Sequence, residues 1–184
     1  MFISVHDLEV KPLQFAEELP AGRIDFGSEI PQQGTLSAKG RADLVEEHHS
    51  GKQTVQDIRF VGSFSGTFEL ACSRCLEAVK AKVGEDFDLL YRPLMSGKQG
   101  DEVSINEAET EIGFYKGNGL ELEDVIKEQV LLSLPVKPLC KEACKGLCPH
   151  CGQNLNTGKC DCTTNVQDPR WAALEALRDQ LKKD

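Results

Sequence analysis

Small or apolar residues alternate with polar residues over two long stretches in the first half of the chain. In residues 35–47 they stand at the even positions Leu36, Ala38, Gly40, Ala42 and Leu44. In residues 58–72 they do so again, at Ile58, Phe60, Gly62, Phe64, Gly66, Phe68, Leu70 and Cys72. Because successive side chains of a strand point to opposite faces, both stretches predict strands with one buried face. The second run is long enough for a strand pair, or for one strand bent at its glycines.

A return strand is predicted over residues 79–91, where Val79, Ala81 and Val83 alternate with lysines. The sequence CSRC of residues 72–75 then lies at the tip of a β-hairpin, which is a common place for half of a zinc site. A redox pair of cysteines usually has the first one at the N-terminus of a helix. Strands on both sides therefore argue against redox chemistry at this turn.

The segments around this hairpin carry different signals. In residues 1–33, Pro12, Pro20, Gly22, Gly27 and Pro31 favour short strands and turns over a helix. Residues 92–119 are acidic and rich in glycine, which predicts a surface loop followed by an edge strand at 103–105 or 111–115.

Two helices are predicted in the last third of the chain. In residues 120–134 apolar side chains recur at helical spacing, and Pro135 and Pro138 end the helix. The second helix begins at Asp168 as N-cap and Pro169 as first residue. Its apolar side is formed by Trp171, Leu174, Leu177 and Leu181.

These elements predict an α+β fold: a strongly bent antiparallel β-sheet or partial barrel with a packed helix, a C-terminal zinc-knuckle segment and a terminal amphipathic helix. Residues 1–139 would form the β-rich core with the helix 120–134. Residues 140–184 would form the zinc-binding segment and the last helix, integrated with the core as a single domain.

Cysteine spacing is the most specific chemical signal. Six of the eight cysteines lie in residues 140–162, and the sequence CPHCG of residues 148–152 has the form of a zinc knuckle. The spacing predicts two zinc ions, each held by four cysteines. One site is formed by Cys72, Cys75, Cys140 and Cys144, and the other by Cys148, Cys151, Cys160 and Cys162. Two alternatives stay open: Cys144 and Cys148 acting together, or some cysteines being buried as small apolar residues.

Composition and charge bear on location and partners. Residues 1–7 show no basic region followed by an apolar run, and no stretch is apolar enough for a membrane span. We therefore expect a cytoplasmic protein with no membrane partner, in a reducing compartment where cysteines serve metal binding.

The net charge is −9, but residues 135–184 carry eight basic and six acidic side chains. Any RNA contact is thus expected in this basic third, because nucleic-acid binding depends on neutralising phosphates. Arg170, Trp171 and Arg178 are candidates for a partner contact. The alternative is that Trp171 packs on its own domain.

The hairpin CSRC, the segment LPVKPLC of residues 134–140, the sequence GLCPHCGQNLN and the final DPRWAAL together resemble the YceD family of large ribosomal RNA accumulation proteins. The resemblance implies a bacterial or plastid protein that supports accumulation of large-subunit ribosomal RNA. We therefore expect a non-enzymatic ribosome-biogenesis factor without a small-molecule substrate, which binds a ribosomal protein or the pre-ribosomal large subunit. The alternative is a zinc-linked thiol redox sensor.

Overall fold

The computed structural model describes residues 1–49, 53–94 and 112–162. These residues divide into two compact units. The first joins Met1–Ser73 to Glu77–Cys140, and the second joins Arg74–Leu76 to the described residues from Lys141 onward. The predicted division at residue 139, and the predicted integration of the two parts, stay predictions.

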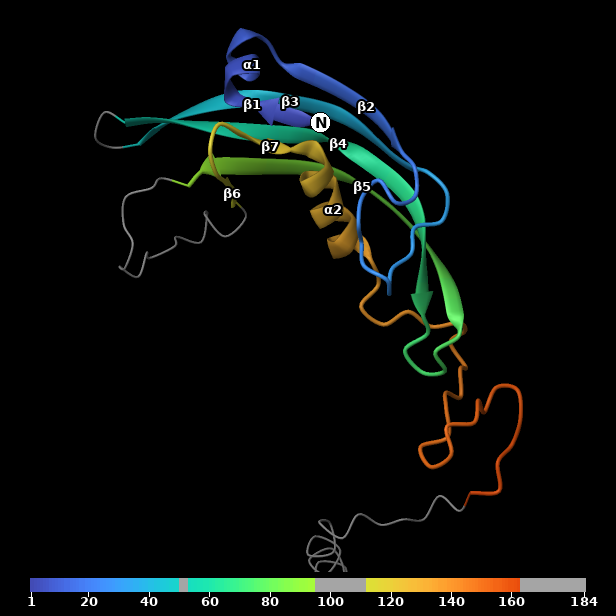
Figure 1. The fold of residues 1–184 in the computed structure, drawn as a ribbon. Helices are drawn as coiled ribbons and strands as arrows, with labels where there is room; N and C mark the ends of the chain where they lie inside the picture. The colour runs from blue at the N-terminus through green and yellow to red at the C-terminus, as the bar shows by residue number, and fades with distance from the viewer. Residues whose placement is uncertain (50–52, 95–111, 163–184) are drawn as a thin grey trace, which may run out of the picture. The chain divides into compact units, whose positions relative to one another are not determined.

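A five-stranded sheet forms most of the first unit (Figure 1). Its strands lie in the order β2 (Leu13–Leu19), β3 (Leu36–His49), β4 (Gln53–Ala71), β5 (Ala78–Pro93) and β6 (Ile112–Tyr115). The strands β2 to β5 pair antiparallel, as predicted, whereas β6 runs parallel to β5. The sheet is therefore mixed. It is also open, whereas a partial barrel was one of the two expected forms. How strongly it is bent stays a prediction.

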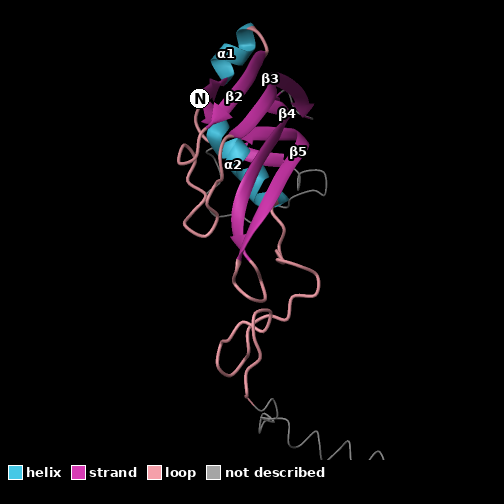
Figure 2. Cartoon of the chain, turned by 90° about the vertical axis from the view of Figure 1, so that its right-hand side faces the viewer, coloured by secondary structure: helices cyan, strands magenta, loops and turns pink. Residues whose placement is uncertain are grey.

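The smaller elements flank this sheet. The strands β1 (Phe2–Ser4) and β7 (Gly119–Glu121) pair antiparallel as a second sheet. The helix α2 (Leu122–Ser133) confirms the prediction for residues 120–134 and lies against one face of the large sheet (Figure 2). Its buried residues, Leu122, Val125, Ile126 and Val130, pack into the core. The predicted helix from Asp168 lies outside the described residues.

The expectation of no helix in residues 1–33 is wrong, because the short helix α1 (Val5–Val10) follows β1. Ser4 caps it: the Ser4 hydroxyl accepts the Asp7 backbone N–H at 3.1 Å. This bond satisfies one of the donors that a helix N-terminus leaves unpaired, and Leu8 adds a buried side chain. A cap and one buried residue are thus enough for a helix of this length when the core lies beneath it.

Aromatic side chains fill the core face of the large sheet. Phe60 meets Tyr91 edge-on at 5.8 Å between ring centroids, and Phe64 stacks with Phe87 at 6.4 Å. These contacts are cross-strand neighbours on the β4–β5 pair, whose register continues without interruption from Ile58 to Ala71. The glycines of β4 therefore mark no bulge in the pairing.

Gly62 instead makes room between strands. It pairs with Gly40 of β3, and a Cβ atom added at Gly62 would lie 2.4 Å from the Lys39 carbonyl oxygen and 2.9 Å from the Phe87 ring. Such distances are far inside van der Waals contact, so the strands or the ring would have to move.

We predict that Gly62→Ala lowers the free energy of unfolding by about 1–3 kcal/mol, the usual cost of overpacking a filled core. Urea unfolding monitored by circular dichroism measures the change. Ser63→Ala, on the same strand but the opposite face, is the matched control and should stay within about 0.5 kcal/mol of the parent. Equal effects of the two substitutions would contradict the packing role of Gly62.

Candidate metal centres

The turn between β4 and β5 presents the first pair of cysteines. The Cys72 N–H donates to the Glu77 carbonyl at 2.8 Å, which closes the turn. Leu76 takes a left-handed backbone conformation with φ of 62°, so the chain can reverse within a few residues. Cys72 and Cys75 are both buried. The prediction that CSRC lies at a hairpin tip is confirmed.

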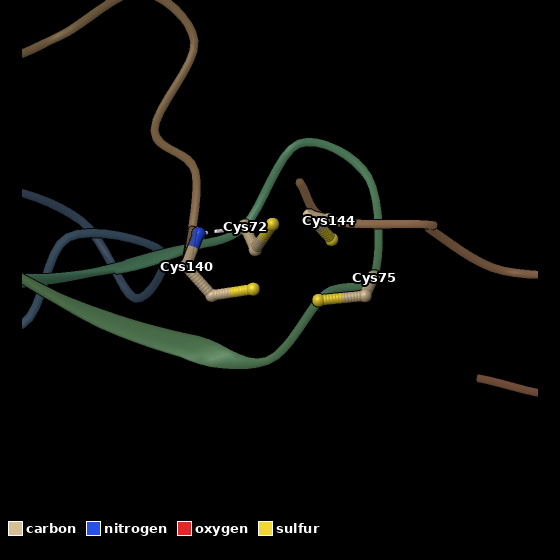
Figure 3. A group of neighbouring side chains, drawn as sticks. All are labelled: Cys72, Cys75, Cys140 and Cys144. Atoms are coloured by element: carbon tan, nitrogen blue, oxygen red, sulfur yellow. Dashed lines mark hydrogen bonds between the residues drawn. The ribbon is translucent and has the colours of Figure 1, made fainter. Parts of the chain in front are cut away.

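Cys140 reaches this turn from the end of α2. The Ser73 N–H donates to the Pro138 carbonyl at 2.8 Å, and the Cys140 N–H donates to the Cys72 sulfur at 3.4 Å, the dashed line in Figure 3. Pro135 and Pro138 cannot continue a helix, and the connection that follows α2 contains bends but no helix or strand. A pair of backbone bonds thus fixes Cys140 beside Cys72, although 68 positions separate them in sequence.

Within the second unit, Arg74 positions the segment that carries Cys144. Its guanidinium donates to the carbonyl oxygens of Glu142 at 3.2 Å and Cys144 at 2.9 Å. Its own carbonyl accepts the Leu147 N–H at 3.0 Å. Gly146, with φ of 74°, passes so close that an added Cβ would lie 3.0 Å from the Arg74 oxygen. Arg74 therefore holds both ends of the short turn at 142–147.

The four sulfurs of Cys72, Cys75, Cys140 and Cys144, here named the proximal cluster, all lie within 4.8 Å of one another (Figure 3). Four sulfurs at about 2.3 Å from a tetrahedral zinc ion lie about 3.8 Å apart. The cluster could therefore hold a metal ion after small side-chain movements. Three of the four cysteines are buried, and Cys140 is exposed.

The distal cluster is formed by Cys148, Cys151, Cys160 and Cys162, whose sulfurs also lie within 4.8 Å of one another. A tight turn aims the first two: the Gly152 N–H donates to the Cys148 carbonyl at 2.9 Å, and Gly152 adopts φ of 73°. Only Cys148 is buried. In the described parts of the chain, these two clusters are the groups of three or more possible metal ligands.

The thiols of the distal cluster differ in acidity. Backbone N–H bonds from Cys151 and His150 to the Cys148 sulfur lower the pKa of Cys148 to about 6. A hydrogen bond with the Cys151 sulfur, followed by partial burial, raises the pKa of Cys162 to about 12. Without a cation, the cluster thus favours a thiolate at Cys148 and a protonated thiol at Cys162. A bound dication would replace those protons, because metal ligation requires thiolates.

The partition into two groups of four matches the predicted ligand sets, although ligation itself stays a prediction. Sequence reasoning gave no role to Arg74 or Asn156, both of which bond to the residue Cys144. The position of Arg74 between two cysteines in the sequence is the one feature that could have indicated its role. The predicted contact residues Arg170, Trp171 and Arg178 lie outside the described residues.

Comparison with protein families identifies the chain. A model described as "Large ribosomal RNA subunit accumulation protein YceD" matches residues 60–178, which include both clusters. The chain belongs to the YceD family. This match confirms the resemblance found in the sequence, and the name of the family suggests a role in accumulation of large-subunit ribosomal RNA.

Three YceD relatives illustrate the range of similarity. The chloroplastic "Large ribosomal RNA subunit accumulation protein YCED homolog 1" of Arabidopsis thaliana is 25% identical over 156 residues, 68% of this chain and 46% of that protein. The uncharacterized protein YlbN of Bacillus subtilis is 25% identical over 182 residues, 98% of this chain and 94% of its own. An uncharacterized protein of Mycobacterium tuberculosis is 35% identical over 170 residues, 92% of this chain and 71% of its own.

The chain thus spans about half the length of the Arabidopsis protein and most of the two bacterial ones. No solved structure matches this YceD chain significantly. In the residues that the structure describes, no helix is long and apolar enough to cross a membrane.

We predict that Arg74→Ala speeds hydrogen exchange at the Cys144 and Leu147 amides about tenfold or more, because it removes two hydrogen bonds from the turn at 142–147. Exchange is read by mass spectrometry or NMR on the purified protein. Lys141→Ala removes a positive charge from the same unit without removing these bonds, and should leave exchange unchanged. An equal effect of both substitutions would show that charge, not the Arg74 bonds, holds the turn.

Proposed function

We propose that this chain is a non-enzymatic cytoplasmic factor in assembly of the large ribosomal subunit. It would support accumulation of the ribosomal RNA by binding a large-subunit protein or an assembly intermediate. Zinc at both clusters would hold the binding surface in shape. The observation that carries this proposal is the presence of two all-cysteine clusters in a member of a family named for ribosomal RNA accumulation.

The donor set supports zinc and a structural role. Each cluster offers four sulfurs, the ligand set typical of structural zinc sites in intracellular proteins. Four protein ligands complete a tetrahedral ion and leave no position for water or substrate. A catalytic zinc site, by contrast, keeps one position open. An ion at either cluster would therefore contribute folding energy to its surroundings rather than chemistry.

Charge favours a basic protein as the first partner. The chain has a net charge of −9, and the acidic side chains are concentrated in residues 85–134. Complementary charge speeds and orients protein association, and a basic ribosomal protein supplies that complement. Direct RNA contact would use the last third of the chain, where basic side chains outnumber acidic ones.

We predict that depletion of the protein reduces mature large subunits in sucrose-gradient profiles, and that expression of Cys75→Ser restores them less than the parent chain does. Loss of one ligand leaves an incomplete proximal cluster and loosens the segment that it holds. Ser73→Ala changes the same turn without touching a cluster sulfur, so it should restore the profile fully. An unchanged profile after depletion would refute the assembly role.

The partner is tested by affinity capture of the full chain from cells, with and without ribonuclease. A ribosomal protein that is retained after ribonuclease treatment would support a protein as the first partner, with RNA contact second. Recovery of RNA without any ribosomal protein would make RNA the primary partner.

A second candidate, a zinc-linked thiol redox sensor, is favoured by the exposure of the distal cluster, where Cys151 is exposed and Cys160 and Cys162 are half-buried. Hydrogen peroxide would take two electrons from two ligand thiolates, which join as a disulfide. The peroxide takes up two protons to give two waters, and the zinc ion leaves. Zinc release under mild peroxide with a parallel loss of partner binding would support this candidate, and zinc retention would remove it.

A further inference from the structure

We propose that Asn156 couples the two clusters, so that an ion at the distal cluster strengthens metal binding at the proximal cluster. Asn156 lies between Cys151 and Cys160, both in the distal cluster, yet its side chain bonds to Cys144 of the proximal cluster. This inference rests on the metal binding argued under the proposed function. The hydrogen bonds that connect Asn156 to Cys144 and to its own loop all lie in the second unit.

The Asn156 amide makes a two-point contact with the chain at 144–145. Its Nδ2 donates to the Cys144 sulfur at 3.3 Å, and its Oδ1 accepts the Lys145 backbone N–H at 2.9 Å. A backbone N–H can only donate, so the oxygen must face Lys145 and the nitrogen must face the sulfur. The direction of the N–H···S bond therefore follows from the chemistry of its neighbour.

Asn154 fixes the orientation of this amide. The Asn154 Oδ1 accepts both the Asn156 backbone N–H and the Asn156 Nδ2, each at 2.9 Å. The Asn154 carbonyl oxygen in turn accepts the backbone N–H groups of Thr157 and Gly158 at 3.3 Å. Both protons of the Asn156 Nδ2 are thus used, one on Asn154 and one on the Cys144 sulfur.

The loop that carries Asn156 begins and ends at the distal cluster. Cys151 precedes it and Cys160 follows it, with residues 152–159 between. The Cys148 N–H donates to the Gln153 carbonyl at 2.8 Å, and the Leu155 N–H donates to the Gly146 carbonyl at 2.9 Å. An ion that binds both ends of the loop closes it and removes much of its conformational freedom. The closed loop keeps Asn156 at Cys144 for a larger fraction of the time.

The N–H···S bond affects the metal because of thiolate charge. A dication held by four thiolates carries a net charge of −2, and N–H donors directed at the sulfurs spread that charge. Outer-shell partners of metal ligands typically change metal affinity by about 10- to 100-fold. Asn156 is therefore a positioning residue for the proximal ligand Cys144, although it does not itself touch the ion.

The test is a double-mutant cycle on the full chain, with Asn156→Leu as one change and the pair Cys160→Ser and Cys162→Ser as the other. Zinc affinity is measured by chelator competition. Cadmium-113 NMR identifies each site, because the serine variant retains only the proximal cluster. Gln153→Leu is the matched control, because it replaces an amide in the same loop whose Nε2 donates to the Lys159 carbonyl and not to a cluster sulfur.

We expect Asn156→Leu and the serine pair each to lower the zinc affinity of the proximal cluster about tenfold or more. The variant that combines these changes should bind zinc at the proximal cluster no more weakly than the serine pair alone does. Gln153→Leu should stay within about twofold of the parent chain. With cobalt at the proximal site, Asn156→Leu should also move the thiolate-to-metal charge-transfer band to lower energy. The lost hydrogen bond raises the energy of the sulfur electrons, which a purely structural role would not do.

Additive losses in the cycle would overturn the coupling, because Asn156 would then act on Cys144 regardless of the distal cluster. Proximal affinity within about twofold of the parent in Asn156→Leu would overturn it as well. Two bound ions in the parent chain, with the same zinc affinity of the proximal cluster in every variant of the cycle, would refute the coupling while leaving the metal proposal intact. A chain that binds no ion at either cluster would refute both.

Discussion

Four thiolates held within 4.8 Å of one another repel strongly unless a cation lies among them. The stability of the cysteine-bearing segments of this chain depends on how that repulsion is relieved. In the absence of a cation the distal thiols must share protons unequally, as the lowered pKa of Cys148 and the raised pKa of Cys162 show. If a cation binds, the same sulfurs would become its ligands, and the ion would stabilise the segment. Residues 141–162 contain no helix or strand of the sheets, so ligation and backbone turns are the means available to order them.

The two clusters are built by different means. The proximal cluster draws on regular structure: the β4–β5 hairpin presents two cysteines, and the proline-containing segment that follows α2 brings a third to them. The distal cluster is local in sequence and depends on tight turns around Gly152 and the loop that follows. This difference matches their burial, since three proximal cysteines are buried and only one distal cysteine is. A buried site suits permanent support, whereas the more exposed site is the one that solvent, oxidants or partners can reach.

Much of this arrangement follows from patterns that a sequence displays. Period-two alternation predicted β3 and β4, because a sheet with one buried face imposes it. Cysteine spacing predicted the grouping of the eight cysteines into two sets of four, while their role as metal ligands stays a prediction. The helix α1 was missed because its signal is one capping serine, Ser4, and one buried Leu8. The sequence predicted an edge strand at 103–105 or at 111–115, and β6 lies at the second of these positions. Its parallel orientation could not be predicted, because orientation depends on the path of the chain and not on its alternation. Arg74 and Asn156 were missed because their roles depend on carbonyls and a sulfur that folding brings to them.

The proposed function in large-subunit assembly rests on family membership, and we propose that the two clusters serve it by holding a binding surface in shape. The central physical claim is that each cluster is a closed four-sulfur zinc site. X-ray absorption at the zinc edge, with elemental analysis of the same reduced sample, tests that claim most directly. The account predicts two zinc ions per chain, each surrounded by about four sulfurs at about 2.3 Å with no nitrogen or oxygen ligand. A single ion, or nitrogen or oxygen in the first coordination shell, would contradict it.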